Sequence, residues 1–251
     1  MYDNTAKDTL NVCAAIAFAK QTGQELHWYY AEDKHKKSTI TDEHLMNYLT
    51  HLPSGQTQQQ LGRVPLILGM PILVSQNFDV KGGIINGSQS TVSHIHYHVD
   101  DEGHHYLLSV VVHITDSTDE NLSHLLPHNL PILADMTAIS FKHPYSDQNC
   151  RIHCTQVPIL PAFTMTVHQA QGQTLDSIII DLQSCKGTEA PYDMASCAHS
   201  LHGLLILHPF EKGLPFTAVP KYSQLILRIS YVQGTNNGAE SFGCLSLRSL
   251  K

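Results

Sequence analysis

The sequence predicts an α/β fold in which a parallel sheet with helices is interrupted by a small antiparallel β unit. Two apolar runs, residues 177–182 and 204–207, flank a helical segment. This order is typical of parallel strands joined by a helix. Residues 91–114 alternate between apolar and polar around a short turn, which is typical of an antiparallel hairpin. We therefore expect two kinds of sheet within the 251 residues.

Composition narrows the class of protein. Hydrophobic residues make up 42% of the chain and charged residues 15%, which argues against an intrinsically disordered chain. The longest apolar run, residues 64–74, contains Pro71 and is too short to span a bilayer. The first residues lack the pattern of a secretory signal, so we expect an intracellular protein without membrane contact. The six cysteines are irregularly spaced, which favours reduced thiols.

Charge does not favour a broad nucleic-acid surface. The formal net charge is −7, and the 15 lysines and arginines are outnumbered by 18 histidines. Because an unperturbed imidazole titrates near pH ~6.5, we expect mild acid to change the field around this protein strongly.

The N-terminal part is expected to be helical at its start. Asn4 caps the first helix, Gly23 ends it, and its predicted apolar stripe comprises Leu10, Ala14, Ala17 and Phe18. The segments that follow are a strand at 25–30, a solvated loop at 32–37, a helix at 42–52, a Gln-rich linker at 53–60 and a broken strand or strand pair at 65–75.

The middle and C-terminal parts differ in character. The predicted β unit, residues 90–158, contains the hairpin, a polar loop at 115–131 and strands at 138–141 and 151–157. After it come a strand at 162–167, a loop or helical turn at 168–174, a strand at 177–182 buried on both faces, a helix from Pro191 to about Leu201 and a buried strand at 204–207. The tail, residues 210–251, has no assigned structure.

Two segments of the C-terminal part carry the functional signal. His168-Gln-Ala-Gln-Gly-Gln-Thr174 follows a predicted strand, at the position where open α/β sheets bind ligands. Its residue types alone are equally typical of an ordinary polar loop. The second segment runs from Tyr192 to Gly203 and is uninformative by itself.

Taken in series, the two segments resemble motifs of the C-terminal half of Pif-type DNA helicases, a branch that includes the helicase part of Helitron transposons. Residues 168–174 match the family motif His-Lys-Ser/Ala-Gln-Gly-Gln-Thr, and residues 192–203 match Tyr-x-x-x-Ser-Arg-x-x-Ser-Leu-x-Gly. Residues 69–74 with 86–88, and residues 4–24, give supporting likeness, so that the resemblance covers about residues 4–209.

The resemblance implies a discontinuous second RecA-like domain, residues 1–89 and 159–209, with an inserted small β-barrel at 90–158. The family unwinds DNA 5′ to 3′ with ATP and Mg, in the nucleus of eukaryotes. By this resemblance Gly172 and Gln173 would contact nucleotide, and His168, Gln171 and Thr174 would contact single-stranded DNA.

Departures from the family motifs imply lost catalysis. Cys197 occupies the position of the arginine finger, which contributes roughly 10³ to 10⁵ in rate, and Gln169 occupies that of the motif lysine. Gln89 replaces a further basic residue, and the chain contains no Gly-x-x-x-x-Gly-Lys-Ser/Thr phosphate loop. We therefore expect a helicase piece, from a broken gene or a transposon remnant, that binds single-stranded DNA weakly and does not hydrolyse ATP without the missing N-terminal half.

Two alternatives stay open. One is a non-enzymatic module that binds single-stranded DNA or a partner helicase half. The other is a zinc-binding hairpin protein, because His94, His96 and His98 alternate along one predicted strand and Cys150, His153 and Cys154 lie on another.

Overall fold

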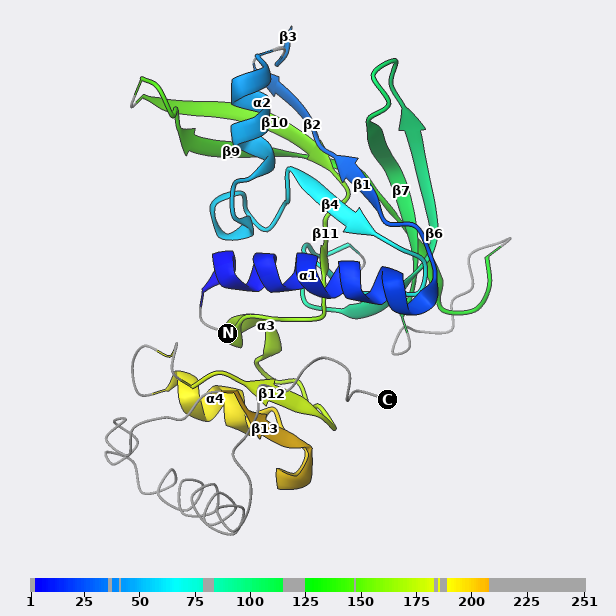
Figure 1. Ribbon diagram of the computed structural model, residues 1–251, viewed down its shortest axis with the longest axis vertical. Helices are drawn as coiled ribbons and strands as arrows, with labels where there is room; N and C mark the ends of the chain where they lie inside the picture. Colours follow the sequence, from blue (N-terminus) through cyan, green and yellow to red (C-terminus); the bar gives the residue numbers. More distant parts are fainter. Residues whose placement is uncertain are drawn as a thin grey trace. The chain divides into compact units, whose positions relative to one another are not determined.

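The computed structural model describes residues 3–35, 38–40, 42–78, 84–114, 125–146, 148–182, 185 and 189–207. The chain divides after Ala170 into two compact units, each of which is described by itself (Figure 1). The predicted 210–251 tail and most of the predicted 115–131 loop lie outside the described residues.

The first unit is built around a seven-stranded sheet. Six of its strands follow the order β11-β5-β6-β7-β1-β4, and β8 pairs with β7 beside them. The strands are β1 (His27–Tyr30), β4 (Arg63–Leu66), β5 (Pro71–Val74), β6 (Gln89–Val99), β7 (His105–His113), β8 (Asn129–Leu133) and β11 (Ile159–Pro161). The two end strands, β11 and β4, contact each other, so the sheet is nearly closed and barrel-like.

The hairpin of β6 and β7 confirms the prediction made from alternation. The two strands pair antiparallel from Thr91–His113 to Val99–His105, with register shifts at two places. Inward side chains such as Val92, Val110 and Val112 are almost fully buried in the main hydrophobic core.

A second sheet has the order β3-β2-β10-β9. Its strands are β2 (Glu32–His35), β3 (Ser38–Thr39), β9 (Asp135–Lys142) and β10 (Asn149–Gln156), and helix α2 (Glu43–Thr50) contributes to the same small core. Asp42 caps α2 by accepting from the amides of His44 and Leu45. A short 3₁₀ helix, η1 (Ser54–Gln56), lies within the predicted Gln-rich linker.

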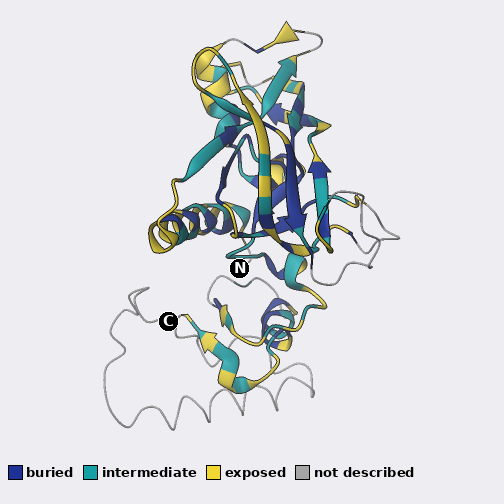
Figure 2. Ribbon diagram, turned by 90° about the vertical axis from the view of Figure 1, so that its right-hand side faces the viewer, coloured by how far each residue is buried: buried dark blue, intermediate teal, exposed yellow. Residues whose placement is uncertain are grey.

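Helix α1 (Asn4–Thr22) forms as predicted, but its buried face differs from the predicted stripe (Figure 2). Leu10 is 40% exposed, whereas Lys7, Asn11, Ala15 and Ala19 are the buried residues. The polar members of this face have hydrogen-bond partners, which removes the usual cost of burying them. The cap is Asp3 rather than Asn4, and Gly23 ends the helix with φ +67°.

Three further predictions are wrong. The charged residues 32–37 were expected to form a loop, but Glu32–His35 is strand β2, paired with β10. Part of the predicted 115–131 loop belongs to strand β8. The predicted 162–167 strand is replaced by β11 at Ile159–Pro161 and by the start of helix α3 (Val167–Ala170). Cross-strand pairing decided each of these, and local composition does not report it.

The second unit contains a parallel strand pair. β12 (Ile178–Ile180) pairs in register with β13 (Leu204–Ile206), and helix α4 (Ala190–Ser196) and the 3₁₀ helix η2 (Leu201–Gly203) lie between them in sequence. Pro191 stands in the first turn of α4, as predicted. β12 is not buried on both faces, since Ile179 is 56% exposed.

The predicted α/β fold class, with parallel strands and an antiparallel barrel-like insertion, is confirmed. β1 and β5 pair with strands of the 90–158 segment, so that this segment shares a sheet with what precedes it. The domain boundaries at 89 and 158 stay a prediction. Among the described residues, no helix has the length and apolar character needed to cross a membrane.

Candidate functional site

The first predicted motif begins in helix α3, whose start is closed by a capping box. The Gln169 Oε1 atom accepts from the Thr166 amide at 3.0 Å and from its hydroxyl at 3.2 Å. The Gln169 amide lies 3.4 Å from Thr166 Oγ1 in return. Gln169 Nε2 also donates to Gln59 Oε1 at 3.3 Å. The side chain of Gln169, which was predicted to stand at the lysine position of the family motif, therefore holds the local fold.

The segment leading into α3 is held by helix α1. Asn11 donates from Nδ2 to the Thr164 carbonyl at 3.0 Å and accepts from the Thr164 amide at 2.8 Å. The Thr164 hydroxyl donates to the Lys7 carbonyl at 3.1 Å. These contacts explain why Asn11 is buried, and they fix the chain two residues before the capping box.

The remainder of the motif lies in the second unit. Gln171, Gly172 and Thr174 are exposed, and Gln173 is half-buried. Gly172 has φ +82°, a left-handed conformation that favours glycine, and a Cβ there would meet no neighbour. The glycine is therefore required by the turn itself. His168 is exposed on α3 in the first unit.

Leu175, the residue after the first motif, pairs with the segment that follows helix α4. The Leu175 amide donates to the Cys197 carbonyl at 2.8 Å, and the His199 amide donates to the Leu175 carbonyl at 2.9 Å. A parallel bridge between Leu175 and Ala198 results. Leu175, which directly follows the first motif, and Ala198, which belongs to the second, are more than twenty positions apart in the sequence but lie side by side.

Gly203, the last residue of the second motif, packs against the chain just after the first. A Cβ at this position would overlap the carbonyl oxygen of Asp176. Asp176 also pairs with His199, whose Nδ1 lies 3.2 Å from Oδ1, and both side chains are largely exposed. Glycine is therefore needed at this position for the close approach of two backbone segments.

Cys197, the residue that was predicted to occupy the arginine position of the family motif, carries no positive charge. Its side chain is 2% exposed, and Sγ lies 3.2 Å from the Asp193 carbonyl oxygen. Burial, and then the negative charge of Asp193, raise the pKa of the thiol above its ordinary value. The thiol is neutral near pH 7, so it can neither replace a guanidinium nor act as an activated nucleophile.

The three alternating histidines are exposed on β6. His96 Nδ1 lies 2.9 Å from Ser109 Oγ, and the ring of His98 stacks on Tyr106 with 5.3 Å between centroids. The described residues do not bring His94, His96 and His98 together as a group of metal ligands. Cys150, His153 and Cys154 lie on β10, in the other sheet.

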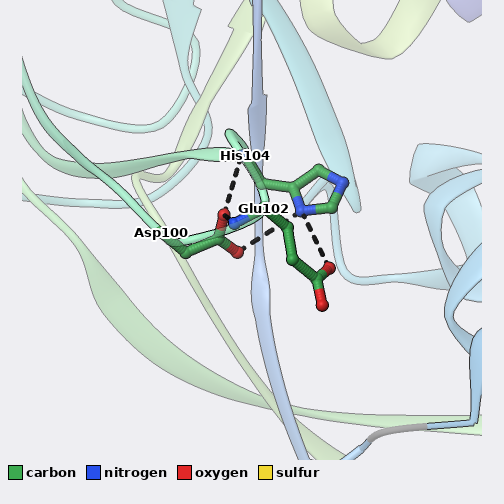
Figure 3. A group of neighbouring side chains, drawn as sticks. All are labelled: Asp100, Glu102 and His104. Atoms are coloured by element: carbon green, nitrogen blue, oxygen red, sulfur yellow. Dashed lines mark hydrogen bonds and ion pairs between the residues drawn. The ribbon is translucent and has the colours of Figure 1, made fainter.

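Sequence reasoning missed a different cluster, at the turn between β6 and β7 (Figure 3). The carboxylates of Asp100 and Glu102 lie 3.3 and 3.6 Å from His104 Nδ1, and Asp100 Oδ1 accepts from the amides of Glu102 and His104. Desolvation opposes ionisation of Asp100, but these hydrogen bonds outweigh it and lower its pKa. The motif Asp-x-Glu-Gly-His was readable in the sequence as a turn, and the cluster has satisfied partners within itself.

The similarity of this chain to known proteins is found by comparing structures and not by comparing sequences. No model of a known protein family matches the chain, and no curated protein matches its sequence. Solved structures of Pif1 helicases do match. The enzyme of Candida albicans covers 91% of this chain with a TM-score of 0.55 and 16% identity. The Bacteroides protein bound to single-stranded DNA covers 90%, with a TM-score of 0.52 and 18% identity. A Bacteroides complex with ADP-AlF3 and single-stranded DNA covers 88%, with a TM-score of 0.51 and 18% identity.

The class that these observations define is a mixed α/β fold with a parallel strand pair and a nearly closed, barrel-like sheet. More specifically, the chain has the fold of part of a Pif1 helicase. It spans 48%, 45% and 43% of the three solved chains, which is less than half of each.

Proposed function

We propose that this chain is the C-terminal part of a Pif-type helicase that binds single-stranded DNA weakly and does not hydrolyse ATP by itself. The observation that carries the proposal is the pairing of Leu175 with Ala198. This pairing supports the proposal because it brings the residue that follows the first motif next to the second motif, in which we assign Cys197 to the arginine-finger position. The proposal also assigns the domains: residues 1–89 and 159–209 form a discontinuous RecA-like domain, and residues 90–158 form a small β-barrel inserted into it.

The residues present do not fit a complete ATP–Mg site. Gly172 and Gln173 form a turn in which Gly172 is exposed and Gln173 is half-buried. The second motif, residues 192–203, contains no lysine or arginine that could pair with a nucleotide phosphate. Cys197 is buried, neutral and turned to a backbone carbonyl of its own helix. Since the chain also lacks a phosphate loop, a second protein half would have to supply most of the contacts to nucleotide.

Contact with DNA has better support. His168, Gln171 and Thr174 are all exposed, and each offers a hydrogen-bonding side chain to a phosphate or base. Two of the similar solved structures, both of Bacteroides Pif1, contain single-stranded DNA. With a net charge of −7 and neutral residues at three family cation positions, the affinity is expected to be low.

The test uses the purified full chain, labelled oligonucleotides and ATP. We expect salt-sensitive binding to single strands and no phosphate release above the background of a protein-free control. ATP turnover that is stimulated by DNA in the chain alone would overturn the proposal that the chain does not hydrolyse ATP by itself. Absence of any binding to single-stranded DNA at low salt would overturn the proposed DNA binding.

A module that binds a partner helicase half without ATP is compatible with the same fold. It is distinguished by mixing the chain with a Pif-type N-terminal half and measuring complex formation by sedimentation. Origin from a Helitron-type transposon belongs to the proposal as well and is checked by the genomic sequence upstream of Met1. A nuclear location in a eukaryote is also proposed and is checked by imaging the tagged chain in cells.

A further inference from the structure

Arg63 and Trp28 form a cation–π pair on the outer part of the first unit. The guanidinium carbon lies 4.6 Å from the centroid of the Trp28 ring. β1 and β4 are antiparallel, with Tyr30 opposite Arg63 and Trp28 opposite Pro65. Trp28 and Tyr30 are two residues apart on one strand, so both side chains share the face of the sheet that carries Arg63.

His51 holds the guanidinium from a second side. Arg63 Nη2 donates to His51 Nε2 at 3.0 Å, because a guanidinium has donors only. His51 Nδ1 lies 2.7 Å from the Asn47 carbonyl, to which it donates. Both ring nitrogens are thereby assigned, and the imidazole is neutral. Arg63 is thus fixed by one ring face and one neutral acceptor.

The charge of Arg63 is not compensated by either partner. Lys7 is paired with Asp8 at 3.1 Å and Lys34 with Glu32 at 3.4 Å, whereas no carboxylate among the described residues lies within 4.0 Å of Arg63. The contact with His51 uses one of the five N–H donors of the guanidinium. A rigid cation with open donors is therefore presented beside two aromatic side chains.

We propose that Arg63, held by Trp28 and His51, binds a backbone phosphate of single-stranded DNA. The planar fork of a guanidinium matches phosphate geometry, and immobilising it beforehand lowers the entropy lost on binding. A cation beside exposed or half-exposed aromatic rings is the combination that single-stranded nucleic acid recognises, because bases stack while phosphates pair. Trp28 and Tyr30 are both half-exposed. The inference rests on the proposed function and adds a site outside both family motifs.

The experiment compares two charge-removing variants of the full chain, Arg63→Gln and the matched control Arg151→Gln. Arg151 is exposed on β10 of the same unit, so the control removes the same charge from another surface. Binding of a labelled single strand is measured by anisotropy over a range of salt. We expect Arg63→Gln to weaken binding about tenfold at low salt and to reduce the salt slope by about 0.7, the value for one phosphate contact on a single strand. Arg151→Gln should leave the slope as in the wild type.

Trp28 provides an independent readout, because it is the only tryptophan of the chain. Single-stranded DNA should change its fluorescence in the wild type and in Arg151→Gln, and the change should be lost in Arg63→Gln. Far-ultraviolet circular dichroism and thermal midpoints check that the variants fold. If Arg63→Gln does not fold, Arg63→Lys decides the question, since it keeps the charge but not the planar fork. It should retain the slope and lose part of the affinity.

Three outcomes separate the two proposals. Wild-type DNA binding with equal slopes for Arg63→Gln and Arg151→Gln would overturn the Arg63 site while leaving the proposed function intact. An affinity of Arg63→Lys equal to that of the wild type would likewise overturn the role given to the guanidinium. If the wild type does not bind single strands at all, both proposals fail.

Discussion

The backbones of Leu175 and Ala198 form a parallel bridge that joins the residue after the first predicted motif to the segment that follows helix α4. Two hydrogen bonds of 2.8 and 2.9 Å make this bridge, and Gly203 closes against Asp176 beside it. Because the bridge consists of backbone atoms, it survives replacement of side chains. The bridge can therefore form with Cys197 at the position where the resemblance predicts an arginine.

Gly203→Ala should destabilise the second unit by about 1–3 kcal/mol, because the added Cβ would overlap the Asp176 carbonyl and the backbone would have to move. Hydrogen exchange of the Ile178–Ile180 amides is the measurement, since it reports opening of β12 alone. The exposed neighbour His202→Ala is the control and should leave protection unchanged. Equal protection in both variants would show that the close approach is unimportant.

Lys7→Ala should cost about 3 kcal/mol of unfolding free energy. Lys7 is 1% exposed, and its Nζ donates to Ser54 Oγ at 2.9 Å and lies 3.1 Å from Asp8 Oδ1. Its removal leaves a largely buried carboxylate without its cation. Urea denaturation followed by Trp28 fluorescence measures the loss. Lys20→Ala, on the exposed side of α1, should change stability by no more than about 0.5 kcal/mol.

Asp33 should make the first unit less stable as pH rises. Burial raises its pKa from 3.8 to about 6, while a hydrogen bond with Cys154 acts in the opposite direction. The folded state therefore holds this proton more tightly than the unfolded chain. The favourable contribution is complete below about pH 4 and is lost as pH rises through about 6.

The variant Asp33→Asn isolates this effect from that of the histidines. Its stability relative to the wild type should increase between about pH 4 and pH 7, by an amount on the order of 2 kcal/mol. Urea denaturation of both proteins at several pH values is the measurement. A stability difference that stays constant over this interval would contradict the raised pKa.

Restoring the family cations should not restore catalysis. The double variant Cys197→Arg and Gln169→Lys should release no phosphate above background without a helicase N-terminal half. Arginine at 197 must also leave a buried position, and lysine at 169 loses the acceptor that caps α3. Phosphate release is therefore measured with and without such a half, and turnover by the repaired chain alone would refute the expectation.

Periodicity and turn residues sufficed for the local elements. Gly23, Pro191 and the alternation of the β6–β7 hairpin correctly located a helix end, a helix start and a strand pair. The order of apolar runs correctly predicted that β12 and β13 are parallel. The two motifs were readable because a few residue types at fixed spacing are demanded by backbone geometry, as Gly172 and Gly203 show.

Tertiary structure alone decided which surfaces are buried and which strands pair. The charged segment Glu32–His35 became a strand because β10 offered it partners, and α1 buried Lys7 and Asn11 because Ser54 and Thr164 satisfy them. The placement of Arg63 between Trp28 and His51 likewise joins residues from β1, the end of α2 and β4. Sequence patterns report the preference of each segment for helix, strand or turn. Contacts between distant segments depend on free energies that only the assembled chain contains.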